Sequence, residues 1–176
     1  MEINLERIKS PDGLEKIRDL YISSFPASER REFHELVDML DLLECSVCLI
    51  KIPTGKVAGF CIVWDFKSFA FLEHFAIEID LRGLGIGEGV LSVLREKYTT
   101  ILLETELPVN EINQRRINFY QRNGFRLLDM KYVQPSYGKN KPEVELHLMS
   151  TSVDFSVETL DECTHLIRER VYRKIF

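Results

Sequence analysis

Residues 82–89, RGLGIGEG, form the most informative stretch of the chain. Four glycines (Gly83, Gly85, Gly87 and Gly89) lie here, directly after a predicted strand and at the start of a predicted helix. The first amides of a helix have no intrahelical partner, and they lie at the positive end of the helix dipole. Glycines let an anion approach closely because they carry no Cβ. The stretch therefore predicts a pyrophosphate-binding turn.

The spacing of these glycines excludes two familiar phosphate-binding motifs. The dinucleotide fingerprint G-x-G-x-x-G would need glycine at position 88 or 90, which hold Glu88 and Val90. A nucleoside-triphosphate loop would need a lysine followed by serine or threonine after its last glycine, and neither is present. The pattern that fits is R-x-x-G-x-G, from Arg82 to Gly87.

Hydrophobic periodicity on both sides of the turn predicts a mixed order of strands and helices. The expected strands are 2–9, 44–51, 57–65, 69–77, 100–105, 125–133 and 143–149. Helices are expected after Ser10, after Ser28, after the glycine turn, over 112–122 and over 156–173. This order predicts one α/β (α+β) domain, with a mixed, largely antiparallel central sheet flanked by helices.

A second motif lies downstream, in Asn113, Arg116, Tyr120 and Asn123-Gly124-Phe125. Together the two motifs resemble the GNAT superfamily of N-acetyltransferases, whose signatures are Q/R-x-x-G-x-G/A and N-x-x-A-x-x-x-Y…GF. The resemblance covers residues 2–149. It leaves residues 150–176 as an extra amphipathic helix, whose apolar stripe must be buried on the same domain or in a homodimer.

The resemblance implies that acetyl-CoA is the cosubstrate. Main-chain groups of one strand would bind the pantetheine arm, as in β-augmentation. Arg82 would contact phosphate or merely flank the turn, and Asn113 would contact the cofactor or cap its helix. The implied cofactor-binding residues are Phe75, Ala76, Ile77, Arg82, Gly83, Leu84, Gly85, Ile86, Gly87, Asn113 and Tyr120.

Three residues depart from the family pattern. Ile79 stands where many members have proline, and Arg116 replaces a small alanine. Glu88 places a carboxylate in the first turn of the helix, where it would repel a phosphate, so we expect it to point away from the turn.

Two side chains are candidates for proton transfer. Tyr120, whose alternative role is simple packing, would protonate the departing CoA sulfur. Glu73 interrupts an apolar strand and shares strand parity with Phe75 and Ile77, so it is a candidate general base. The rival bases are Glu104 and Glu106 on the next strand, and His74 on the opposite face; a structural salt bridge is the alternative role of Glu73.

The predicted function is transfer of an acetyl group to a primary amine, in a small molecule or a peptide, by direct attack. The alternative is a CoA-binding or interaction protein that transfers nothing. Residues 28–31 border the acceptor site in the resembling family, unless they are only a solvated helix start.

Composition restricts the remaining possibilities. A net charge of -5 disfavours nucleic-acid binding by a broad basic face. The sequence shows no signal peptide and no apolar run long enough for a membrane span, so we expect a cytoplasmic protein. Cys45 and Cys48 form a C-x-x-C on a predicted strand, where they would point to opposite faces as buried thiols, and no metal is implied.

Overall fold

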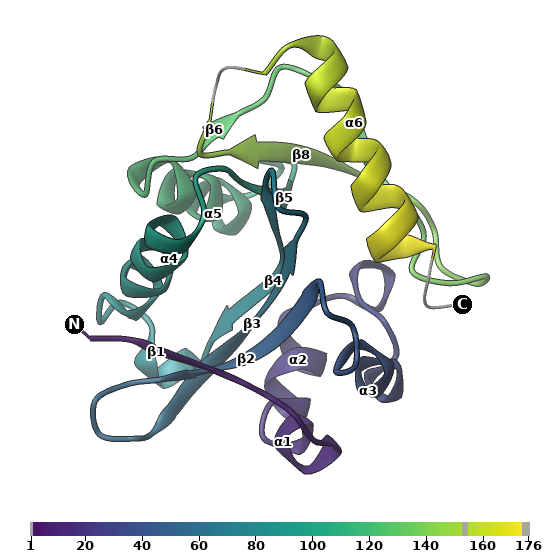
Figure 1. Cartoon of the computed structure of the whole chain (residues 1–176). Coiled ribbons are helices and arrows are strands. Elements are labelled where there is room, and N and C mark those ends of the chain that lie inside the picture. Colours follow the sequence, from purple (N-terminus) through teal and green to yellow (C-terminus); the bar gives the residue numbers. More distant parts are fainter. Residues whose placement is uncertain (1, 153–154, 174–176) are drawn as a thin grey trace.

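One mixed sheet runs through the computed structural model, which describes residues 2–152 and 155–173 (Figure 1). The strands follow the order β1-β2-β3-β4-β5-β8-β6, and β7 pairs with β8. β4 and β5 are parallel, whereas the other strand pairs of the described residues are antiparallel. The strands are β1 (Asn4–Arg7), β2 (Cys45–Lys51), β3 (Val57–Asp65), β4 (Ala70–Ile77), β5 (Ile101–Glu106), β6 (Arg126–Leu127), β7 (Tyr132–Gln134) and β8 (Val144–Ser150). The predicted largely antiparallel sheet is confirmed.

Helices cover both faces of this sheet (Figure 1). On one face, α4 (Ile86–Lys97) and α5 (Glu111–Arg122) bury Val90, Leu94 and Ile117 in the smaller apolar core. The other face carries the larger core, which includes Trp64 and Ile167. The elements over that face are α1 (Pro11–Glu15), α2 (Arg18–Ser24), the 3-10 turns η1 (Ala27–Glu29) and η2 (Phe33–Glu35), α3 (Leu36–Met39), α6 (Val157–Ile167) and the π turn η4 (Arg168–Tyr172).

Three predicted elements differ from the structure. The single strand predicted over 125–133 is two short strands, β6 and β7. The single helix predicted after Ser28 is divided into η1, η2 and α3, and residues around Arg31 are extended because Arg31 is drawn into the core. The last helix passes into the π turn η4 before Arg173.

The central strand β4 contains an extra residue, Glu73. Ile62 of β3 pairs with His74, but the next residue, Val63, pairs with Leu72, so Glu73 is left in a bulge. The parity prediction is therefore wrong: Glu73 contacts the larger core together with His74, while Phe75 packs against the smaller core.

The two parallel strands separate directly after this bulge. The last pair between β4 and β5 joins Leu72 to Leu103. Glu73 and Glu104 are thus the first residues of the two diverging strands. Beyond this splay point, residues 75–77 pair with β3 on one side and have no strand partner in the described chain on the side of β5.

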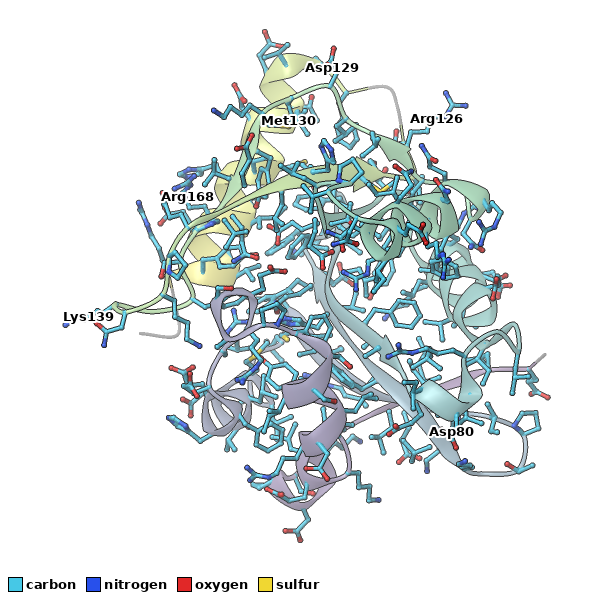
Figure 2. The ribbon with its side chains drawn as sticks, turned by 180° about the vertical axis from the view of Figure 1, so that it is seen from behind. Asp80, Arg126, Asp129, Met130, Lys139 and Arg168 are labelled. Atoms are coloured by element: carbon cyan, nitrogen blue, oxygen red, sulfur yellow. The ribbon has the colours of Figure 1, made fainter. Side chains whose placement is uncertain are left out.

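Polar side chains project from two of the surface loops, and the C-terminal helix is tied to the larger core. Asp129 and Lys139 project outward from their loops (Figure 2). Cys163 and Ile167 of α6 are buried in the larger core. The predicted division at residues 149 and 150 stays a prediction, and residues 153–154 and 174–176 of the second part lie outside the described chain.

Cys45 and Cys48 are buried thiols on the two faces of the sheet. Cys45 and Cys48 lie in different cores, so their predicted placement on opposite faces is confirmed, and both are free thiols. In the part of the chain that the structure describes, no helix has the length and apolar character that crossing a membrane requires.

Candidate active site

A cavity of about 750 Å³ opens where β4 and β5 separate. One part of its wall, the glycine end, comes from the turn before α4 and includes Arg82, Gly83 and Gly85. The other part, the carboxylate end, is lined by Glu29, His74, Glu73, Glu104, Thr105, Glu106, Gln134 and Tyr137. Residues from nine elements and the loops between them, far apart in the sequence, therefore share one cavity.

The glycine end is built from backbone that only glycine adopts readily. Gly83 has φ +77° and Gly85 has φ +78°, both in the left-handed region. Ideal Cβ atoms at these positions would meet nothing within 4 Å, so the space beside the turn is open. Gly85 is the N-cap of α4 and provides no side-chain cap, which leaves the first amides of this 12-residue helix available to an anion.

The other predicted residues of the turn occupy different places. The Arg82 Nε donates a 2.9 Å hydrogen bond to the Ile77 carbonyl, so this side chain folds back along β4. Ile86 and Gly87 line the cavity, but Leu84 does not and is 55% exposed. Glu88 also belongs to the lining, and the predicted direction of its carboxylate, away from the turn, stays a prediction.

The free edge of β4 forms the wall between the two ends. Phe75, Ala76 and Ile77 all line the cavity, and their main chain lacks a strand partner on the β5 side in the described chain. An extended ligand arm laid along this edge would meet unpaired backbone groups, as an added strand does.

Tyr120 of α5 lines the same cavity and is 8% exposed. Burial, aided by the charge of Glu106 and opposed by that of Arg116, raises the pKa of Tyr120 to about 12. The phenol therefore keeps its proton throughout the neutral range. Thr105 also lines the cavity, and its buried hydroxyl has no hydrogen-bond partner among the described residues.

Helix α5 is capped by a residue other than the predicted one. The Asn110 side chain accepts a 2.9 Å hydrogen bond from the Asn113 amide, so Asn110 is the N-cap. The Asn113 side chain donates to the Leu107 carbonyl, and this residue is absent from the cavity lining. The unusual Arg116 forms an ion pair with Glu106.

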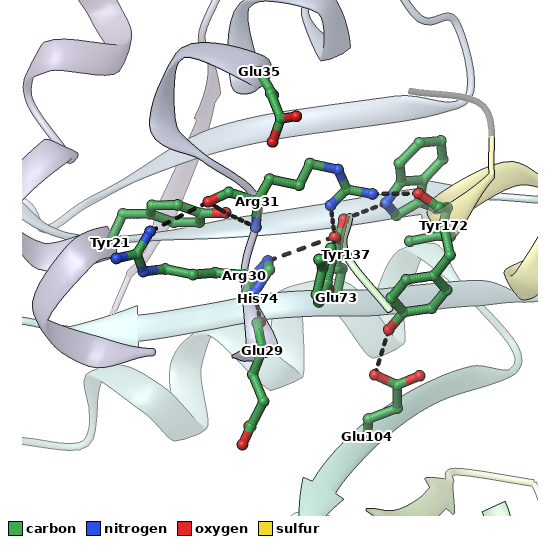
Figure 3. Close-up of polar contacts among 12 residues, drawn as sticks. Tyr21, Glu29, Arg30, Arg31, Glu35, Glu73, His74, Glu104, Tyr137 and Tyr172 are labelled. Atoms are coloured by element: carbon green, nitrogen blue, oxygen red, sulfur yellow. Dashed lines mark hydrogen bonds and ion pairs between the residues drawn. The ribbon is translucent and has the colours of Figure 1, made fainter. Parts of the chain in front are cut away.

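Glu73 is locked in a buried network (Figure 3). Its Oε1 accepts hydrogen bonds from the Arg31 guanidinium and, at 3.0 Å, from the Tyr137 hydroxyl, while its Oε2 accepts from Trp64 Nε1 at 2.6 Å. The Arg31 and Glu73 side chains are both 0% exposed. This is the salt bridge that the sequence left open as the alternative role of Glu73.

His74 lies beside Glu73 rather than across the sheet from it. Its Nε2 donates a 3.0 Å hydrogen bond to the Glu29 carbonyl, and its Nδ1 lies 3.7 Å from Glu73 Oε1. Burial lowers the pKa of His74 to about 3, so the ring is neutral at physiological pH.

Glu104 lies where β4 and β5 begin to separate, and its surroundings differ from those of Glu73. Its Oε1 accepts from the Tyr132 hydroxyl, and its Oε2 accepts from the Tyr172 hydroxyl at 2.6 Å. Burial raises the pKa of Glu104 to about 7, although both hydroxyls favour the charged form. Burial and the charge of Glu106 also raise the pKa of Glu29. The carboxylate end therefore holds one group, Glu104, that can exchange its proton near neutral pH.

Sequence reasoning missed several of these partners. The segment around Glu29 and Arg31 is not a solvated helix start, because Glu29 lines the cavity and Arg31 is fully buried. Tyr132 and Tyr172 carry no motif that links them to Glu104. One signal was available: an isolated glutamate in the apolar strand ILLET requires a buried donor.

Comparisons with known proteins agree with this geometry. Residues 14–125 match the acetyltransferase (GNAT) family. The solved structure of a Bacteroides thetaiotaomicron protein assigned to the GNAT family is 32% identical, with a TM-score of 0.87, and the alignment covers 96% of this chain and 98% of that chain. A Vibrio cholerae spermidine N-acetyltransferase, solved in complex with CoA and spermine, is 14% identical with a TM-score of 0.62 over 85% of this chain and 94% of its own, and thus shares the fold.

A curated relative gives a shorter match. YjbC of Bacillus subtilis (strain 168), assigned as an acetyltransferase, is 38% identical over 65 residues, which are 35% of this chain and 33% of that protein. The match thus spans about a third of that relative's length. The family match, which covers more than half of the chain, and the full-length likeness to the Bacteroides structure carry the assignment. This chain belongs to the GNAT family of acetyltransferases.

Proposed function

We propose that the protein transfers the acetyl group of acetyl-CoA to a primary amine by direct attack. The observation that carries this proposal is the joining, in one cavity, of an uncapped glycine turn, a free strand edge, a protonated phenol and a group of carboxylates. Acetyl-CoA supplies the acetyl group as an activated thioester.

The chain's own groups fit such a cosubstrate. The amides at the start of α4 would hold a pyrophosphate, and the open space beside Gly83 and Gly85 allows a phosphate to approach them. The main chain of residues 75–77 would hold the pantetheine arm and polarise the thioester carbonyl. The unpartnered Thr105 hydroxyl is a further polar group that a ligand would satisfy. The cofactor contact predicted for Asn113 remains a prediction.

The carboxylate end favours an amine acceptor. Glu29, Glu104 and Glu106 all line it, and Arg116 is paired with Glu106. An excess of negative charge in a partly dry cleft attracts a cationic ammonium group. The ammonium must then lose a proton before its nitrogen can attack, and a neighbouring carboxylate can accept that proton.

Tyr120 supplies the proton that the departing sulfur needs. Its raised pKa keeps the phenol protonated, and its place in the cavity lining supports this role. Among the described residues that line the cavity there is no cysteine. This supports a single transfer step without a covalent acetyl-enzyme.

The test measures release of free thiol from acetyl-CoA with a panel of amines, beginning with polyamines, aminoglycosides and peptides. We expect Tyr120→Phe to lower kcat about 100-fold or more while acetyl-CoA affinity, measured by calorimetry, stays the same. Tyr98→Phe is the matched control, because Tyr98 does not line the cavity. Wild-type turnover in Tyr120→Phe would exclude the acid role, and binding without thiol release on any acceptor would favour a CoA-binding protein.

A further inference from the structure

Building on the proposed amine acetylation, we infer that Glu104 is the general base and that two tyrosines, Tyr132 and Tyr172, position it. Tyr172 belongs to the C-terminal π turn, beyond the residues 14–125 that match the family. The inference therefore makes the C-terminal segment a structural part of the active site.

The alternative base, Glu73, is held in its charged form by the buried Arg31 guanidinium. Arg31 and Tyr137 donate to one of its oxygens, and Trp64 donates to the other. Its side chain is 0% exposed. Protonating this carboxylate would leave a buried guanidinium without its counterion, which is strongly unfavourable. Glu73 thus holds the loop of Arg31 against β4 rather than moving protons.

Glu104 has both access and spare acceptor capacity. It is the first residue of β5 after the last pair with β4, so it lies where the free edge of β4 begins. It lines the cavity at that point. Each of its oxygens accepts one tyrosine hydroxyl, and a carboxylate oxygen has two lone pairs. One lone pair on each oxygen remains for an amine.

The groups around Glu104 set its pKa to a value that suits proton transfer at neutral pH. Tyr132 from β7 and Tyr172 from η4 donate to it, and the Tyr137 ring lies 4.8 Å from that of Tyr172. Among the charged neighbours, Glu29 from η1 raises the pKa of Glu104 and Arg31 lowers it. With burial as the largest cause, the pKa of Glu104 reaches about 7, near the value that suits a general base at neutral pH.

The π turn that carries Tyr172 is anchored to the hydrogen-bond network around Glu73. Val171, the residue before Tyr172 in this turn, accepts a hydrogen bond from the Arg31 guanidinium through its carbonyl oxygen. Arg31 therefore connects Glu73 to the backbone that presents Tyr172 (Figure 3). π turns are rare and frequently lie at functional sites. This chain of contacts gives the Tyr172 hydroxyl a fixed direction toward Glu104.

The experiment compares pH profiles of kcat/KM for the wild type, Glu104→Gln, Tyr172→Phe and Tyr132→Phe, with one amine acceptor throughout. We expect Glu104→Gln to lower kcat/KM about 100-fold and to remove the acidic limb near pH 7. In Tyr172→Phe, loss of a hydrogen bond to the charged carboxylate raises its pKa, so the limb moves up by about one pH unit. Activity then falls about tenfold at pH 6 and returns to the wild-type value at pH 9. The ionisation of the acceptor amine is common to all variants and cancels in the comparison.

A second measurement does not depend on turnover. Carbon NMR of labelled glutamate should reveal one side-chain carboxyl that titrates near pH 7, disappears in Glu104→Gln and titrates higher in Tyr172→Phe. Glu145→Gln on β8, an exposed residue, is the matched control that should leave the profile and this signal unchanged.

The outcomes separate this inference from the proposed function. A wild type that releases no thiol with any amine contradicts the proposed function, whatever the NMR titration gives. An active wild type whose Glu104→Gln variant keeps its rate and its acidic limb overturns the inference alone. A uniform loss of activity at every pH in Tyr172→Phe, with an unmoved carboxyl titration, would reduce Tyr172 to a packing residue and also overturns it.

Discussion

Replacing Arg31 by methionine should destabilise the protein severely, because the buried Glu73 carboxylate would lose its counterion. Both side chains of the pair are 0% exposed. The substitution also removes the guanidinium bond to the Val171 carbonyl and the cation–π contact with Tyr137, whose ring centroid lies 4.9 Å away. Methionine retains most of the buried volume, so the effect reports lost polar contacts rather than a cavity.

The expected magnitude follows from these contacts. Breaking one partner of a buried ion pair costs about 3–5 kcal/mol of the free energy of unfolding. A domain of this size has about 5–15 kcal/mol in total, so the variant stands near the limit of folding. With a urea dependence of about 2 kcal/mol per molar, the unfolding midpoint should fall by about 2 M. Glu73→Gln should lose a comparable amount, since it leaves Arg31 buried without an opposite charge.

The assay is a double-mutant cycle followed by urea unfolding. The variant Arg31→Met with Glu73→Gln contains no unpaired buried charge, and it should regain at least about 2 kcal/mol relative to the sum of the single losses. The exposed pair Arg115 and Glu111 serves as the control, since its removal should leave the midpoint unchanged. Single losses below about 1 kcal/mol, or losses that simply add, would refute the interpretation of Glu73 as one half of a structural ion pair.

Two further predictions concern the turn and the titrating groups. Gly85→Ala should weaken acetyl-CoA binding, measured by calorimetry, because alanine at φ +78° is strained by about 1–2 kcal/mol. The control is Gly55→Ala, at φ +82° in a distant hairpin, which should leave the affinity unchanged. Equal affinity in both variants would contradict the anion-binding turn. Folding raises the pKa of Glu104 from 4.5 to about 7, so its contribution to the free energy of unfolding should be present below pH 4.5 and lost as the pH rises to about 7. That contribution is at most about 3 kcal/mol. Glu104→Gln should abolish this pH dependence in urea unfolding measured from pH 4 to 8. The contribution of His74 to the free energy of unfolding has the opposite pH dependence, because folding lowers its pKa from 6.5 to about 3. An unchanged pH dependence of stability in both Glu104→Gln and His74→Phe would contradict these assignments.

The parts of the site that the sequence predicted are those fixed by local backbone chemistry. The left-handed turn at Gly83 and Gly85 follows from glycine spacing between a strand and a helix. The end of α5 at Asn123-Gly124 follows from the left-handed Gly124, with φ +86°. Neither feature depends on a partner distant in the chain, which is why a short pattern was sufficient to identify it.

The assignment of faces on β4 failed for a physical reason. Side chains alternate along a strand, so a single extra residue reverses the face of everything before it. The bulge at Glu73 arises where β4 leaves β5, and nothing in AFLEHFAI marks it. The N-cap alternative for Asn113 failed through a small shift in register, because the helix begins after Asn110 instead.

The roles of the two carboxylates at the splay depend on contacts that no local pattern contains. Glu73 and Glu104 occupy equivalent places at the start of two diverging strands, and both follow an apolar run. Arg31, 42 positions before Glu73, makes the first a counterion, and Tyr172, 68 positions after Glu104, makes the second a hydrogen-bonded acid near neutrality. A strongly basic partner fixes a carboxylate in its charged form, whereas neutral hydroxyls in a dry site leave its proton exchangeable. The difference between a structural and a reactive carboxylate in this cavity is therefore set by the chemistry of the donor, and each donor reaches the site only through the tertiary fold.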